Sequence, residues 1–163
     1  MTRKHTKRKV YPLCYDTMRY VKEGVSVTPT ALLDQLTMRD LSSLDAMAHG
    51  LGTLQEWVDL KTCMNVCEHM AMNGVGPEAL PFCRQLEAAL IDAAKRFERT
   101  KSMGLTGAGI QAARHVIEYH QLQRASITRK EYEQFIRATG DRIRSQAPEV
   151  TSLQSSQFEK ETT

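Results

Sequence analysis

The sequence has few aromatic residues, few cysteines and no long hydrophobic run. Of its 163 residues, 6% are aromatic and four are cysteines. Four cysteines are sparse for the disulfide framework of a secreted protein of this length, and no apolar segment follows the basic start. The longest apolar runs fall far short of the roughly 20 residues that span a bilayer. We therefore expect reduced thiols, no membrane association and a cytoplasmic location.

Recognisable catalytic motifs are also lacking. The chain has no HExxH sequence, no supported Ser-His-Asp set and no paired carboxylates in a known context. Residues 104–109 are rich in glycine and precede a helix, but they lack the strand and the lysine of a phosphate loop. His115 with Glu118, and Tyr119 with His120, bring titratable groups together but also fit an ordinary half-exposed helix surface. We predict no enzymatic activity and no cofactor.

Zinc prefers side chains of the kind found at Cys63, Cys67, His69 and Cys83. A zinc knuckle draws two ligands from a tight turn, whereas Cys63 and Cys67 lie one helical turn apart. Cys67 also falls on an apolar stripe, and buried cysteine packs as a small hydrophobic residue. We predict that these residues pack in the core and form no metal site.

Charge is distributed unevenly, although the net charge is only +3. Residues 1–9 hold five basic and no acidic residues, residues 10–94 hold five basic against eleven acidic, and residues 95–144 hold eleven basic against five acidic. The halves could attract each other across a bundle, or the basic residues could form a binding face. The candidate contacts for nucleic acid or an acidic partner are Arg3, Lys4, Lys7, Arg8 and Lys9, with an additional basic face of Arg124, Arg129, Lys130 and Arg142.

A dense basic arm can gain sequence-independent affinity for nucleic acid by releasing counterions from the phosphate backbone. The last predicted helix argues against nucleic-acid binding, because its charges alternate in sign along one face. Such a face is typical of salt bridges in solvent. The alternating residues are Lys130, Glu133, Arg137, Asp141 and Arg144.

Apolar residues recur at helical spacing through the middle of the chain, and no segment alternates as a strand would. We predict an all-α fold, a compact bundle of five to seven helices. A flexible basic arm covers residues 1–13, a single helical domain covers 14–147, and a disordered polar tail covers 148–163. The predicted helices span about 16–22, 28–50, 53–73, 77–100, 110–122 and 128–143, and a break near Thr37 is left open.

Two helix starts have the pattern of a capping box, in which a threonine and a glutamate three residues later satisfy each other's backbone donors. Thr53 with Glu56 and Thr128 with Glu131 fit this pattern. The glycines between residues 104 and 109 predict a flexible link or a close approach of two helices.

The predicted core follows the apolar stripes of these helices. Trp57 continues the stripe of Leu60, Met64 and Cys67, which predicts a core anchor; the alternative is an exposed contact for a partner. Other predicted core positions are Leu36, Leu41, Leu44, Ile117, His120, Tyr132, Phe135, Ile136 and Ile143.

Several segments form a recognisable set: the opening RKH and VYP within residues 3–12, TLQEW at 53–57, NGVGPE at 73–78, and EYHQLQR at 118–124 followed by EYE at 131–133. With these segments the chain resembles small helical accessory proteins of temperate phages and mobile elements of proteobacteria, over residues 1 to about 148. The resemblance carries no catalytic residue. It implies a role in the bacterial host cell in which the protein occludes or remodels a host complex, including CRISPR or other defence machinery.

These features predict a non-enzymatic accessory protein that binds a host protein or ribonucleoprotein complex. The resemblance includes inhibition of a defence system, as by an anti-CRISPR protein, among its roles, but whether the protein inhibits or regulates its partner does not follow from the sequence. The alternative is a nucleic-acid-binding accessory or regulatory protein that uses the basic arm. The partner and the oligomeric state do not follow from the sequence.

Overall fold

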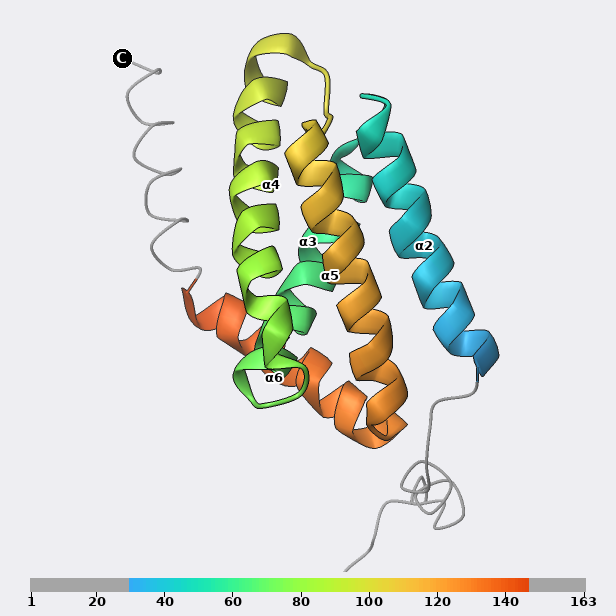
Figure 1. Cartoon of the computed structure of the whole chain (residues 1–163). Helices are drawn as coiled ribbons and strands as arrows, with labels where there is room; N and C mark the ends of the chain where they lie inside the picture. Colours follow the sequence, from blue (N-terminus) through green and yellow to red (C-terminus); the bar gives the residue numbers. More distant parts are fainter. Residues whose placement is uncertain (1–29, 147–163) are drawn as a thin grey trace, which may run out of the picture.

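The computed structural model describes residues 30–146 and confirms an all-α bundle. Within that range there are five α-helices and one short 3-10 turn (Figure 1). The arm at 1–13, the helix predicted at 16–22, the Thr28-Pro29 start and the tail at 148–163 lie outside the described residues. The elements are α2 (Thr30–Ala48), α3 (Leu54–Met72), η1 (Pro77–Ala79), α4 (Leu80–Thr100), α5 (Gly107–Ser126) and α6 (Arg129–Gln146).

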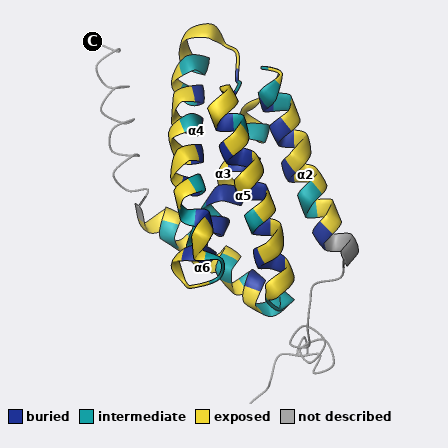
Figure 2. Ribbon diagram, in the orientation of Figure 1, coloured by how far each residue is buried: buried dark blue, intermediate teal, exposed yellow. Residues whose placement is uncertain are grey.

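Helix α3 occupies the middle of the bundle. It packs against α2, α4, α5 and α6, while α5 also packs against α2 and α4. Helix α6 crosses the lower end of the other helices (Figure 1). Buried residues lie on the faces that the helices turn towards one another, and exposed residues cover the outside (Figure 2). The polar cluster of the candidate site lies where α2, α3, α5 and α6 come together.

Both predicted capping boxes are confirmed. The backbone N–H of Thr53 donates to the Glu56 carboxylate at 2.8 Å, and the Thr53 hydroxyl accepts from the first turn of α3. At the start of α6, the N–H of Thr128 donates to Glu131 at 2.8 Å, and the N–H of Glu131 donates to the Thr128 hydroxyl at 3.2 Å. These short-range bonds fix where α3 and α6 begin.

The core contains most of the predicted stripes. Leu60, Met64 and Cys67 are buried, and Trp57 is half-buried and packs against them. The indole N–H of Trp57 donates to the backbone oxygen of Leu90 at 2.9 Å, which ties α3 to α4. Trp57 is therefore a partly exposed anchor of the core.

Three predicted core positions are wrong. Leu41, Ile136 and Ile143 are 42%, 44% and 44% exposed, so none of them belongs to the buried core. A break near Thr37 is also absent, since α2 continues through it and the Thr37 hydroxyl donates to the backbone oxygen of Leu33 at 2.9 Å.

Two glycines allow backbone segments to approach closely. A Cβ at Gly109 would lie 2.9 Å from the Cβ of Ala89, so α5 and α4 meet where no side chain fits. A Cβ at Gly52 would lie 2.3 Å from the Met47 sulfur, beside the backbone bond from Gly52 to Met103. The flexible link predicted over residues 104–109 is shorter in the structure. Helix α5 begins at Gly107, with Thr106 as its N-cap, and so contains Gly109.

Candidate functional site

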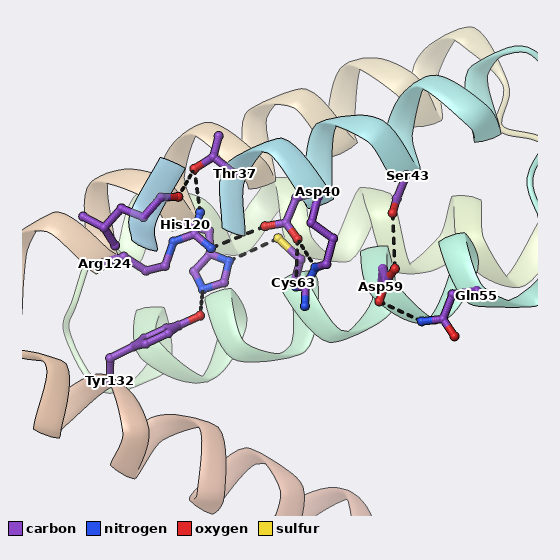
Figure 3. A network of polar contacts seen from close by, with 11 residues as sticks. Thr37, Asp40, Ser43, Gln55, Asp59, Cys63, His120, Arg124 and Tyr132 are labelled. Atoms are coloured by element: carbon purple, nitrogen blue, oxygen red, sulfur yellow. Dashed lines mark hydrogen bonds and ion pairs between the residues drawn. The ribbon is translucent and has the colours of Figure 1, made fainter. Parts of the chain in front are cut away.

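A cluster of polar side chains lies inside the bundle, where four helices meet. Asp40 comes from α2, Cys63 from α3 and His120 from α5, and all three are buried. Each offers one potential metal-ligand atom, and these three atoms lie within 4.8 Å of one another. Figure 3 shows the cluster, with Arg124 and Tyr132 beside it. No other set of three or more such ligands occurs within residues 30–146.

Asp40 is held by two guanidinium groups. Arg124 of α5 donates to one carboxylate oxygen of Asp40 at 3.4 Å. Arg39, which precedes Asp40 in the sequence, donates to the other oxygen at 2.9 Å. Arg124 also donates to the hydroxyl of Thr37 at 3.0 Å. Asp40 and Arg124 are 0% and 1% exposed, whereas Arg39 is 46% exposed. A charged pair is therefore enclosed in the core, with a second arginine reaching it from the surface.

His120 has a contact at each ring nitrogen. Its Nδ1 lies 3.1 Å from the sulfur of Cys63, and its Nε2 lies 3.3 Å from the hydroxyl of Tyr132, which comes from α6. Burial lowers the pKa of His120 well below its usual range, and the charges of Arg124 and Arg39 lower it further. The ring is therefore neutral, with one nitrogen as donor and the other as acceptor.

Cys63 is held as a thiol. Burial raises the pKa of its side chain well above the usual range, and the charge of Asp40 raises it further. Nucleophilic cysteines need the thiolate, which a positively charged and partly exposed setting favours. Cys63 also lies in the middle of α3, where backbone N–H groups are engaged in the helix and cannot stabilise an oxyanion. The dyad with His120 therefore lacks the features of a cysteine hydrolase.

A cavity of 340 Å³ adjoins this cluster. Cys63 and His120 form part of its wall, and Arg39 and Glu133 also line it. The remaining lining residues are mostly apolar, which makes the space suitable for a small molecule or ordered solvent. They are Leu36, Thr62, Val66, Arg129, Tyr132 and Ile136.

The predicted additional basic face is wrong at Arg124, which is enclosed in the core. Two others of the set are paired with acids: Arg129 with Glu133 at 3.1 Å, and Arg142 with Glu68 at 2.6 Å. Lys130 also takes part in an interaction. The proposed arm contacts Arg3, Lys4, Lys7, Arg8 and Lys9 lie outside the described residues.

The four residues considered as zinc ligands are not brought together. Cys63, Cys67 and Cys83 all belong to the buried core, as predicted, and Cys63 also faces His120. His69 lies near α6, where its Nδ1 is 2.8 Å from the hydroxyl of Thr139. The two histidines of α5 lie in different surroundings. His120 is buried, whereas His115 is exposed and lies against the ring of Phe82, with the ring centroids 4.5 Å apart.

Sequence reasoning missed Asp40 and Arg124 as members of the site, although a signal was present. Asp40 lies four residues after Leu36 and four before Leu44, on the apolar stripe of α2. Arg124 continues the series Ile117 and His120 on α5 in the same way. Two opposite charges, each at a core position of its helix, indicate a buried pair.

Several exposed apolar side chains lie close together in the sequence, around the connection between α2 and α3. Leu51, Leu54 and Val58 are 76%, 63% and 41% exposed. Leu51 lies in the connection between α2 and α3, and Leu54 and Val58 are one turn apart in the first turns of α3. We call these three residues the α2–α3 corner.

Among residues 30–146, no helix is both long and apolar enough to cross a bilayer.

Comparison with protein-family models, with curated proteins and with solved structures finds no match to this chain.

Proposed function

We propose that this protein is a non-enzymatic accessory protein that binds a host protein or ribonucleoprotein complex through the α2–α3 corner. The observation that carries the proposal is the exposure of Leu51, Leu54 and Val58 within eight residues of the chain. Apolar side chains grouped on a surface commonly mark an interaction site, because contact with a partner removes them from water. The phage and mobile-element resemblance supports a host complex, including a defence complex, as the partner.

The state of the buried cluster supports a binding role over catalysis. Cys63 is a thiol and His120 is neutral, so the convergent titratable groups lack an activated nucleophile. The ionised pair of Asp40 and Arg124 is fully enclosed and does not line the cavity.

The experiment compares two leucines of similar exposure on different helices. Leu54 is 63% exposed at the start of α3, and Leu122 is 66% exposed near the end of α5. Leu54→Glu and Leu122→Glu each place a charge on the surface, and both should leave the melting temperature close to that of the unaltered protein. Each form, as the full chain, is used to capture partners from a proteobacterial lysate, and the recovered proteins are quantified by mass spectrometry.

We expect Leu54→Glu to lose a defined partner that the unaltered chain and Leu122→Glu retain. A photo-cross-linking amino acid at position 54 should then form a covalent adduct with that partner, and one at position 122 should not. If both glutamate variants recover the same proteins in the same amounts, the α2–α3 corner is not the contact surface and the proposal is wrong.

The alternative function, nucleic-acid binding through the arm, has a separate signature. Removing five phosphate contacts should change the slope of log affinity against log salt by roughly four units. A chain that begins at Val10 and binds DNA and RNA with the unaltered affinity and slope would exclude this role for Arg3, Lys4, Lys7, Arg8 and Lys9.

A further inference from the structure

Asp40, Cys63 and His120 are brought together by tertiary packing. They come from three helices and are 23 and 57 residues apart along the chain, yet their ligand atoms lie within 4.8 Å of one another. All three side chains are buried, so each is held by its surroundings. A set of ligands fixed in this way needs little ordering to bind an ion.

The chemistry of the three atoms fits zinc. A carboxylate oxygen, a cysteine sulfur and an imidazole nitrogen are all common zinc ligands, and the sulfur disfavours magnesium and calcium. Zinc bonds of about 2.3 Å to sulfur and about 2.0 Å to nitrogen place those two atoms about 3.5 Å apart in a tetrahedron. The sulfur of Cys63 and Nδ1 of His120 are 3.1 Å apart. A small opening of this contact would therefore admit the ion.

Two further features match a zinc site with an open position. The second nitrogen of His120 contacts the hydroxyl of Tyr132 at 3.3 Å, and a ligating histidine is usually oriented by a partner at its other nitrogen. Cys63 and His120 also form part of the wall of the 340 Å³ cavity. Zinc sites that take an exogenous ligand have three protein ligands and a fourth position that is open to such a space.

From this arrangement we propose that Asp40, Cys63 and His120 bind one zinc ion, with the fourth coordination position facing the cavity. On binding, the Cys63 S–H bond breaks, a zinc–sulfur bond forms, and the proton passes to solvent. The thiolate and the carboxylate then bring two negative charges to the ion, while the guanidinium of Arg124 stays beside the carboxylate.

The two arginines beside Asp40 have different roles in this proposal. Arg124 is enclosed and keeps its hydrogen bond to Thr37. Arg39 is 46% exposed, so its guanidinium can turn into solvent and leave one carboxylate oxygen free for the ion. Arg39 therefore competes with zinc, and its removal should strengthen binding.

Cobalt(II) is the probe, because it substitutes for zinc and its absorption reports both coordination geometry and sulfur ligation. We expect the full-length protein, reduced and freed of metal, to develop strong visible bands of four-coordinate cobalt and a near-ultraviolet band from thiolate to cobalt. The bands should saturate at one cobalt per chain and disappear when zinc is added. Absence of the thiolate band at excess cobalt would overturn the proposal.

Matched variants locate the site. Cys63→Ala should lower cobalt affinity at least about 100-fold and remove the thiolate band, whereas Cys67→Ala should retain both; Cys67 is also buried on α3, one turn away. Arg39→Gln should raise affinity several-fold, and Tyr132→Phe should lower it about 10-fold. Circular dichroism of the metal-free variants checks that each is folded.

Persistence of the thiolate band in folded Cys63→Ala would show that another cysteine binds the metal, and would overturn the assignment. Equal loss of the band in Cys63→Ala and Cys67→Ala would overturn it as well. Unchanged affinity in Arg39→Gln would contradict the competition between Arg39 and the ion for the carboxylate of Asp40.

Discussion

The guanidinium of Arg124 and the carboxylate of Asp40 form an ion pair inside the bundle, with 3.4 Å between nitrogen and oxygen. The pair joins α5 to α2, and neither side chain reaches solvent to a significant extent. Removal of one partner would leave the other charge buried without compensation. That outcome is more costly than the loss of a surface salt bridge.

We predict that Arg124→Met lowers the free energy of unfolding by about 3 to 5 kcal/mol. Replacing both partners, as in Asp40→Leu with Arg124→Met, should cost less than the sum of the two single changes, with a coupling energy of about 1 to 3 kcal/mol. Urea denaturation of the two single variants and the double variant measures this. Additive effects would contradict a direct interaction between the two side chains.

A second prediction concerns pH. His120 is neutral in the folded protein because burial lowers its pKa well below the usual histidine value of 6.5, and the charges of Arg124 and Arg39 lower it further. Well above pH 6.5 neither the folded nor the unfolded state binds a proton at this residue. Below it the unfolded state gains a proton that the folded state does not, so the free energy of unfolding should fall by up to about 1.4 kcal/mol per pH unit.

Chemical denaturation at a series of pH values from about 7.5 down to about 5 measures this slope. His120→Gln should give a less stable protein with a shallower pH dependence. Part of the dependence should remain, because burial and Arg142 also lower the pKa of His69. His115→Gln is the control, since that ring is exposed. An identical slope in His120→Gln and the unaltered protein would contradict the prediction.

A third prediction tests the Trp57 anchor. Because the indole is only half-buried, Trp57→Ala should cost about 2 to 3 kcal/mol, below the 3 to 5 kcal/mol typical of a fully buried aromatic residue. Trp57→Phe keeps most of the packing but loses the hydrogen bond to Leu90, so it should cost about 1 kcal/mol.

Trp57 is the one tryptophan of the chain, so its fluorescence reports on this position alone. Emission should be blue-shifted in the folded protein and move to longer wavelength on denaturation. Emission of a solvated indole in the folded protein, together with an unchanged melting temperature in Trp57→Ala, would instead support the exposed-contact interpretation.

A fourth prediction compares two glycines of the same helix. A Cβ at Gly109 would lie 2.9 Å from Ala89, whereas a Cβ at Gly107 meets no atom within 4 Å. Gly109→Ala should therefore force α4 and α5 apart and cost about 1 to 3 kcal/mol. Gly107→Ala should be neutral or stabilise the protein by up to about 1 kcal/mol. Thermal denaturation distinguishes them, and equal effects would contradict the close approach.

The sequence predicted local features better than tertiary ones. The bonds between Thr53 and Glu56 and between Thr128 and Glu131 span three residues, so their spacing in the sequence already specifies the contact. The charge of Arg124 predicts a surface position, whereas the structure pairs it inside the core with Asp40, 84 residues away. A charge on an apolar stripe indicates burial only when its counterpart on another helix is known.

The candidate site depended even more on packing. The cavity exists because α6 brings Tyr132 and Ile136 to the cluster formed by α2, α3 and α5. The periodicity of α6 gives the apolar face of that helix but not its crossing angle, and Ile136 was accordingly assigned to the core although it is exposed. The proximity of Cys63 and His120 could not be predicted for the same reason, since they are 57 residues apart.

The enclosed pair of Asp40 and Arg124 also determines how far α2 slides along its own axis. The inward-facing positions of α2 recur at intervals of three and four residues, so a shift of one turn, about 5.4 Å, would still bring apolar side chains to the neighbouring helices. These positions are Leu33, Leu36, Asp40, Leu44 and Met47. The same shift would carry Asp40 away from Arg124 and leave a guanidinium buried without a carboxylate. Apolar contact thus holds α2 against the bundle. The single pair of opposite charges selects one position of α2 along its axis from several positions with similar apolar contacts.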